Sequence, residues 1–64
     1  MENKVIKIMK VMEGVCESAA SDAMKFADGN NSAGTRVRKA MQNVKNLAQE
    51  IRVEVQNQKN SIAV

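Results

Sequence analysis

The sequence predicts an all-α protein, an antiparallel two-helix hairpin of the coiled-coil type that forms one domain over residues 1–64. Apolar residues recur at alternating spacings of three and four residues in both halves of the chain, the pattern of a helix with one apolar side. A short segment rich in Gly and Asn separates the halves. There is no proline, tryptophan or tyrosine, and the Val, Ile, Met and Ala content suits helix packing better than a sheet core.

The first helix is expected over about residues 3–27. A helix turns about 100° per residue, so apolar residues at these spacings fall on one narrow stripe. Ile6, Ile8 and Val11 lie to either side of it, which makes the apolar surface broader than one partner helix covers. The expected core or oligomer contacts of this helix are Val5, Met9, Met12, Cys16, Ala19, Ala23 and Phe26.

Residues 28–31 are expected to form the turn. Gly29 suits the left-handed residue that closes a helix, and Asn30, Asn31 or Ser32 can cap the next one. The second helix can restart near Asn31 or only at Thr35, and we favour the earlier start. Because the connection is short either way, the two helices are expected to be antiparallel neighbours.

The second helix is expected over about residues 32–58, followed by a frayed tail over residues 59–64. Its length matches that of the first helix, which supports a hairpin over two unrelated segments. Ala40 and Leu47 widen its apolar side. The expected core or oligomer contacts of this helix are Val37, Met41, Val44, Ala48, Ile51 and Val55.

Stability of so small a chain is expected to require self-association. A chain of 64 residues hides a small share of its surface and needs an additional source of stability. One cysteine and no histidine argue against a disulfide framework or a zinc site, so no metal or other cofactor is expected. The broad apolar surface therefore predicts a homo-oligomer, with a dimer that forms a four-helix bundle favoured.

The net charge of +3 is unevenly distributed. Residues 11–28 carry four acids and one lysine, whereas residues 29–49 carry four cations and no acid. For Lys45 and Arg52, the sequence does not distinguish an ion pair across the hairpin from contact with an external anion. Arg36, Arg38 and Lys39 crowd the turn, where few acids are expected to reach them. The outer side of the second helix carries a continuous stripe of cations and glutamines, namely Arg38, Gln42, Lys45, Gln49, Arg52, Gln56 and Lys59.

Several function classes are disfavoured by the composition. Without histidine, nothing activates Cys16 as a nucleophile, and no enzyme activity or small-molecule substrate is expected. No stretch approaches the roughly 20 apolar residues that span a bilayer, and the N-terminal residues do not resemble a signal peptide. Contact of Lys4, Lys7 and Lys10 with a membrane surface is disfavoured because their apolar neighbours have a protein partner. The expected location is the cytoplasm, where an unpaired thiol is ordinary.

The stretch GNNSAGTRVRK at residues 29–39, followed by spaced apolar residues and a basic helix, resembles the chlamydial histone-like family. These are small bacterial proteins likened to the eukaryotic linker histone. Arg36 and Arg38 match the family's Arg-x-Arg pair, and the resemblance to its N-terminal domain extends from about Ile6 to Lys59. It implies sequence-nonspecific DNA binding and nucleoid compaction without catalysis. The family's long Lys/Ala/Pro-rich C-terminal tail is absent from these residues, so weak binding by a monomer is expected.

The function predicted from both arguments is nonspecific binding of double-stranded DNA within the nucleoid. A dimer would double the number of cations and could bridge two duplex segments. The alternative is a structural or adaptor coiled coil, in which the charges only set helix pairing and nucleic acid plays no part. The expected DNA contacts are Arg36, Arg38, Lys39, Lys45 and Arg52.

Overall fold

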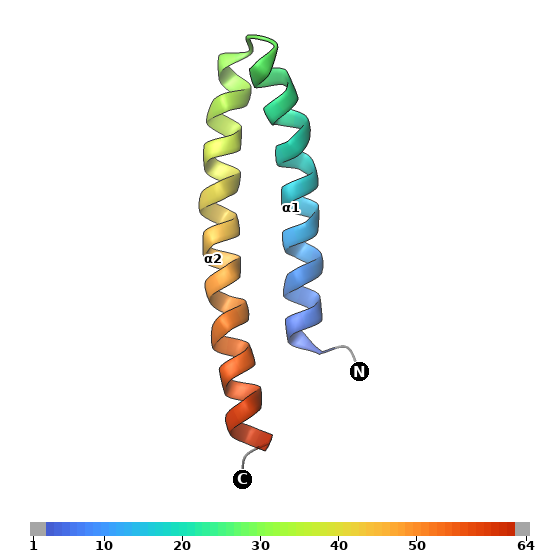
Figure 1. Ribbon diagram of the computed structural model, residues 1–64, viewed down its shortest axis with the longest axis vertical. Coiled ribbons are helices and arrows are strands. Elements are labelled where there is room, and N and C mark those ends of the chain that lie inside the picture. The colour runs from blue at the N-terminus through green and yellow to red at the C-terminus, as the bar shows by residue number, and fades with distance from the viewer. Residues whose placement is uncertain (1–2, 63–64) are drawn as a thin grey trace.

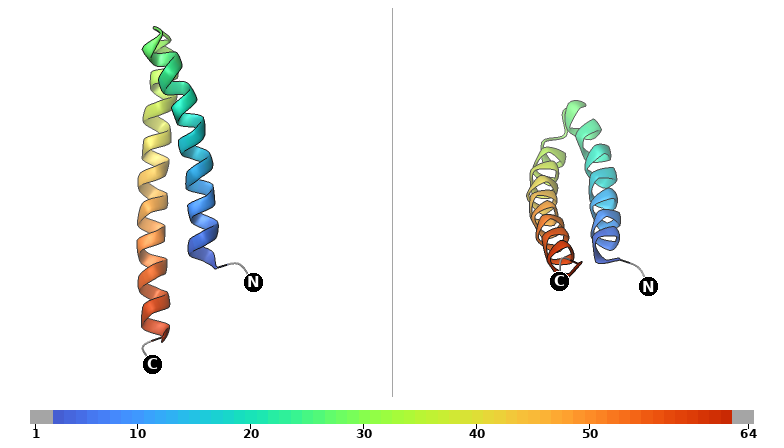
Figure 2. Two further views of the ribbon diagram at one scale, coloured as in Figure 1. Left: turned by 45° about the vertical axis from the view of Figure 1, so that its right-hand side comes forward. Right: turned by 60° about the horizontal axis from the view of Figure 1, so that its bottom comes forward.

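The computed structural model describes residues 3–62 of the chain and consists of two α-helices. Helix α1 covers Lys4–Ala27 and helix α2 covers Asn31–Ile62. They run antiparallel and side by side from a tight turn, and no strand occurs among the described residues (Figure 1). The predicted fold, an all-α hairpin, is confirmed. Figure 1 and the left view of Figure 2 show that α2 continues past the N-terminal end of α1.

The turn is closed by a Schellman motif. The amide of Asn30 donates to the carbonyl oxygen of Lys25 at 3.0 Å, and the amide of Gly29 donates to that of Phe26 at 2.9 Å. Gly29 has a φ of 104°, the left-handed conformation that a side chain disfavours. The role that the sequence predicts for Gly29 is therefore confirmed.

Helix α2 starts at Asn31, the earlier of the two possible starts. The side-chain oxygen of Asn30 accepts a hydrogen bond from the amide of Ala33 at 3.0 Å and caps the helix. At its other end α2 continues to Ile62, whereas the sequence places the helix end near residue 58. In an isolated helix, amide side chains compete for the hydrogen bonds of the backbone. Here they bond to one another along the helix, and the side-chain amide of Gln56 donates to the side-chain oxygen of Asn60 at 3.1 Å. Residues 63 and 64 of the expected tail lie outside the described part.

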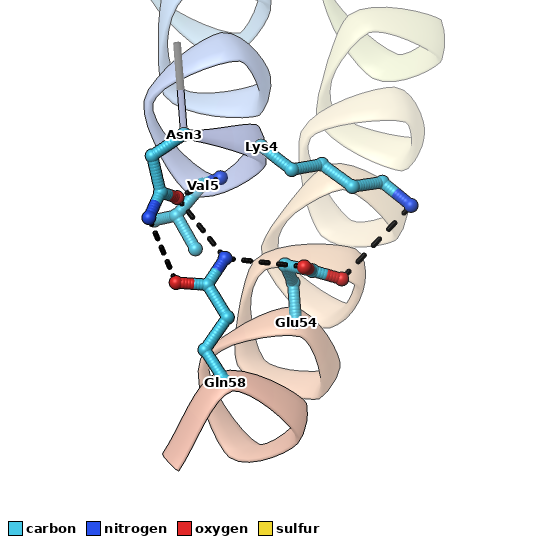
Figure 3. A network of polar contacts seen from close by, with 5 residues as sticks. All are labelled: Asn3, Lys4, Val5, Glu54 and Gln58. Carbon is cyan, nitrogen blue, oxygen red and sulfur yellow. Dashed lines mark hydrogen bonds and ion pairs between the residues drawn. The ribbon is translucent and has the colours of Figure 1, made fainter. Parts of the chain in front are cut away.

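The open end of the hairpin is held by a polar network (Figure 3). Asn3 caps α1 by accepting from the amide of Val5 at 2.7 Å, and it exchanges two hydrogen bonds of 2.8 and 3.1 Å with Gln58 on α2. Gln58 also donates to Glu54 at 3.1 Å, and Glu54 lies 3.9 Å from the Lys4 ammonium. One polar cluster thus caps α1 and also joins it to α2.

The helices pack along two positions of a seven-residue repeat, lettered a to g with Val5 and Val37 at position a. Positions a and d carry the least exposed side chains of both helices. Position e follows d directly and faces outward beside the seam. The seam of α1 consists of Val5, Ile8, Met12, Val15, Ala19 and Asp22, and that of α2 consists of Ala33, Val37, Ala40, Val44, Leu47, Ile51, Glu54 and Gln58.

The two stripes predicted from sequence combine positions a and e, so the structure divides them. Their position-a residues lie in the seam, apart from Phe26, which is 53% exposed. Their position-e residues on α1 are Met9, Cys16 and Ala23, and all three are exposed. On α2, Ala48 and Val55 are half-buried, while Met41 is 45% exposed. The outward part of both stripes remains available to a second protein.

The core of a single hairpin is thin. Within the described residues only Ala19 and Ala33 are buried, and no large side chain is fully covered. The hairpin extends 54 Å along its long axis and only 11 Å along its shortest. Each helix therefore buries one side against the other and leaves the rest in solvent. The exposed large hydrophobic residues are Ile6, Met9, Val11, Met24, Phe26, Met41 and Val53.

Candidate nucleic-acid interface

The cationic stripe lies on the outer side of α2. Its members occupy positions b and f of the repeat, which point away from α1, and each of them is exposed. From Arg38 to Lys59 the stripe covers 21 helical steps, about 32 Å at 1.5 Å per residue. No acidic residue interrupts it. It consists of Arg38, Gln42, Lys45, Gln49, Arg52, Gln56 and Lys59.

The cations of the stripe have no counterion within the part of the chain that the structure describes. Among residues 3–62, no carboxylate lies within ion-pair distance of Arg38, Lys45, Arg52 or Lys59. The reason is geometric, because position b lies away from the seam that brings α1 close. The cross-hairpin pairs that would explain Lys45 and Arg52 as structural charges are therefore not formed. Their charge is available to an external anion.

Two shallow depressions follow one another along this side of α2. Arg38 and Lys39 line the first together with Thr35 and Gln42. The second is lined by Lys45, Asn46, Ala48, Gln49 and Arg52. Each combines two cations with neutral hydrogen-bond donors, and the centres of the two depressions are about ten residues, or about 15 Å, apart along the helix. Such groups bind phosphate oxygens, which accept both ionic and neutral hydrogen bonds.

Arg36 has a different environment from the other predicted contacts. Its Nε donates to Oδ1 of Asp22 at 2.9 Å, and the Asp22 side chain is only 16% exposed. The expectation that few acids reach the cations near the turn is wrong for this residue. Asp22 occupies position d, an apolar position in most of the seam, and Arg36 across the seam supplies its counterion. Part of the Arg36 charge is therefore committed to the fold.

The five predicted contacts accordingly lie on two faces. Arg38, Lys45 and Arg52 belong to the outer stripe. Arg36 lines an open groove on the other side of the seam, and Lys39 borders both this groove and the first depression. The structure thus brings Arg38 and Lys39 together at one end of the stripe and Lys45 and Arg52 together in its middle.

A family model described as Histone H1-like protein Hc1 matches residues 6–61, which include nearly all of both helices. The chain belongs to this family. A search of curated proteins and a search of solved structures found no match. The Hc1 family is a histone-like, structural DNA-binding family, so membership supports a DNA-binding, nucleoid-associated role and a non-enzymatic one.

Two side chains of this Hc1-family chain extend the predicted contact set. Lys59 continues the stripe by one more repeat beyond Arg52, and its helical spacing in the sequence is sufficient to place it there. Thr35 joins Arg38 and Lys39 in the first depression, and no charge or periodicity in the sequence indicates this contact.

In the described residues there is no group of three or more potential metal ligands. Neither α1 nor α2 contains an apolar stretch of the length that a membrane span requires.

Proposed function

We propose that this chain binds double-stranded DNA without sequence preference, through contacts between the cations of α2 and backbone phosphates, and that it thereby compacts the nucleoid in the cytoplasm. The observation that carries the proposal is the exposed stripe of cations, which have no counterion among residues 3–62. Arg38, Lys39, Lys45 and Arg52 are the proposed contacts, with Lys59 as a fifth. Phosphate contacts fix the position of a protein on a duplex but carry no sequence information.

The chemistry of the stripe favours the duplex backbone over bases. Phe26 is the only aromatic residue, and it lies near the turn, away from the stripe. A stacking platform for single strands needs several aromatic side chains along a basic groove. Cations that alternate with glutamines along one straight helix instead suit a regular row of phosphates. Each phosphate that they neutralise adds to the affinity through counterion release.

Arg36 has a secondary part in the proposal. Its Nε is bonded to Asp22, but a guanidinium has five N–H donors, so the same side chain can hold the fold and still donate to a phosphate. Replacement of Arg36 is therefore expected to lower both the stability of the hairpin and its affinity for DNA. The stripe cations are expected to affect affinity alone.

A single hairpin offers few cations, so the proposal includes a homodimer. Four or five phosphate contacts per chain give a slope of about −4 in a plot of log affinity against log salt concentration. Two chains on one duplex would double that slope. Two chains with outward stripes could instead hold two duplexes together, which is how a small non-catalytic protein would compact DNA.

The test is a titration of a mixed-sequence duplex at several salt concentrations with two matched double variants. The stripe variant combines Lys45→Gln with Arg52→Gln, and the α1 variant combines Lys7→Gln with Lys25→Gln. Each variant lowers the net charge from +3 to +1. The stripe variant is expected to reduce the salt slope by about 1.8 for each chain, because each lost phosphate contact removes about 0.9. The α1 variant is expected to keep the slope.

Equal losses in the two variants would assign binding to net charge and refute the role of the stripe. Absence of binding at low salt would remove the DNA proposal altogether.

The exposed apolar positions favour a second candidate, an adaptor coiled coil that binds proteins only. This candidate predicts that the stripe variant changes thermal stability or oligomeric state while neither protein binds DNA.

A further inference from the structure

Thr35 places a hydroxyl group inside the proposed DNA interface. It occupies position f of the repeat, seven residues before Gln42, so α1 lies behind it and leaves its side chain exposed. The side chain lines the first depression together with Arg38 and Lys39. Gln42 completes the lining, so the depression combines two positive charges with two neutral side chains. A hydroxyl oxygen therefore lies beside two adjacent cations on the surface that would face a duplex.

The spacing of these residues suits an intramolecular phosphate. Residues three and four apart are neighbours on a helix surface, and Arg38 and Lys39 follow Thr35 by three and four residues. A phosphoryl group on Oγ1 of Thr35 would carry a charge of about −1.5 to −2 at pH 7 and three acceptor oxygens. Among residues 3–62, no carboxylate lies within ion-pair distance of either cation. Both cations are therefore available to a phosphate attached to their own helix.

We propose that Thr35 is a phosphorylation site whose phosphoryl group occupies the first depression and excludes the DNA backbone from it. The inference rests on the proposed function, because it concerns the regulation of the same interface. A protein kinase would transfer the γ-phosphoryl group of a nucleoside triphosphate. The bond between phosphorus and Oγ1 forms, the bond to the β-phosphate oxygen breaks, and the hydroxyl proton passes to a base of the kinase. The nucleoside diphosphate leaves, and hydrolysis of the ester by water and a phosphatase restores the hydroxyl group.

Phosphorylation would act on the interface in two ways. It lowers the net charge of the chain from +3 to about +1, which weakens the attraction to any polyanion. It also pairs Arg38 and Lys39, two of the proposed contacts, with an anion that a covalent bond holds next to them. Each lost phosphate contact removes about 0.9 from the salt slope, so the loss of both is expected to reduce the slope by about 1.8. The modification thus releases this end of α2 from DNA.

Two other hydroxyl side chains show what distinguishes Thr35. Ser18 lines the groove on the other side of the seam, where a phosphate would meet the carboxylate of Asp22. Ser32 is exposed in the first turn of α2, three residues before Thr35. The cation that follows Ser32 at a spacing of four is Arg36, whose Nε is already bonded to Asp22. A phosphate on Ser32 therefore adds the same charge near the same end of α2 without two free cations beside it, which makes it the matched control.

The test compares three full chains made by chemical synthesis, namely the unmodified chain, the chain with a phosphate on Thr35 and the chain with a phosphate on Ser32. Each is titrated with a mixed-sequence duplex at several salt concentrations. The phosphate on Thr35 is expected to lower the affinity at least about tenfold at about 0.1 M salt and the salt slope by about 1.8. The phosphate on Ser32 is expected to lower the affinity less than about threefold, because salt screens it, and to keep the slope. Equal effects of the two phosphates would assign the loss to net charge and overturn the proposal.

A double variant tests the contact between the phosphate and the depression. Arg38→Gln with Lys39→Gln removes both cations, so a phosphate on Thr35 in that chain is expected to leave the salt slope unchanged. Phosphorus-31 NMR measures the contact without DNA. The second pKa of the phosphate on Thr35, ordinarily about 6, is expected to be lower in the otherwise unchanged chain than in the variant, because the two cations favour the dianion. Equal pKa values would show that the phosphate does not lie in the depression and would overturn the proposal.

The modification itself is tested by mass spectrometry of the chain isolated from the cells that produce it. A phosphate on Thr35 is expected in part of the protein, since a switch requires both forms. Its absence at every stage of growth would overturn the proposal and leave the DNA-binding function intact. If the unmodified chain binds no duplex at low salt, the proposed function is wrong and the proposed regulation is wrong with it. The unmodified chain therefore distinguishes the two failures.

Discussion

Two glycine-to-alanine substitutions in the helices are expected to have opposite effects on stability. Gly14 lies in α1, and a Cβ placed there would meet no atom within 4 Å. Gly34 lies in the first turns of α2, where a Cβ would come within 2.6 and 2.7 Å of two ring carbons of Phe26. The helix propensity of alanine favours both changes by up to about 1 kcal/mol, so only the surroundings distinguish them.

The cost at Gly34 follows from the position of the Phe26 ring. Phe26 is 53% exposed, so about half of the 150–250 Å² that a phenylalanine can bury is covered. A Cβ at residue 34 would displace the ring and return about 100 Å² to water, a loss of about 2.5 kcal/mol. After the gain in propensity, Gly34→Ala is expected to lower the free energy of unfolding by about 1.5 kcal/mol. Gly14→Ala is expected to raise it by about 1 kcal/mol.

Thermal unfolding monitored by far-UV circular dichroism measures both effects. For a chain of this size 1 kcal/mol corresponds to about 4–8 °C, so the two variants are expected to differ in Tm by at least 10 °C. The comparison is made at one protein concentration, because self-association would make Tm depend on it. Equal stabilisation by the two substitutions would show that Phe26 does not rest on Gly34 and would refute the packing assigned to the turn.

Three further predictions concern the turn, the ion pair and the open end. Gly29→Ala is expected to lower stability by at least 1 kcal/mol, since its φ of 104° disfavours a side chain; an unchanged Tm would contradict this conformation. A double-mutant cycle of Asp22→Asn and Arg36→Gln, measured by urea unfolding, is expected to give a coupling of about 0.5–1 kcal/mol, because Arg36 is partly exposed; zero coupling would place the pair outside the fold. Asn3→Ala removes the cap of α1 and both hydrogen bonds to Gln58, so the free energy of unfolding is expected to fall by about 1–2 kcal/mol, measured as a lower Tm. The control Asn60→Ala, which removes one exposed side-chain hydrogen bond, is expected to have little effect.

Much of the candidate site is already determined by local sequence. Cations that recur every seven residues, two turns of helix, must lie on one side of any straight helix, so Arg38, Lys45 and Arg52 share a face whatever the helix packs against. Arg36 could not be assigned in this way. Its partner Asp22 is distant in the sequence and sits in the seam, and only the packing of the two helices brings the charges within 2.9 Å.

The sequence by itself determined two amphipathic helices, the left-handed Gly29 between them and the basic outer side of α2. These features depend on periodicity and backbone conformation, which act over a few residues. The tertiary structure alone decided which flank of position a enters the seam. Ile8 and Val15 on one flank are as apolar as Met9 and Cys16 on the other, so hydrophobicity does not choose between them. The docking of α2 turns the first pair inward and leaves the second pair exposed beside the seam, because a helix presents only one side to a single neighbour.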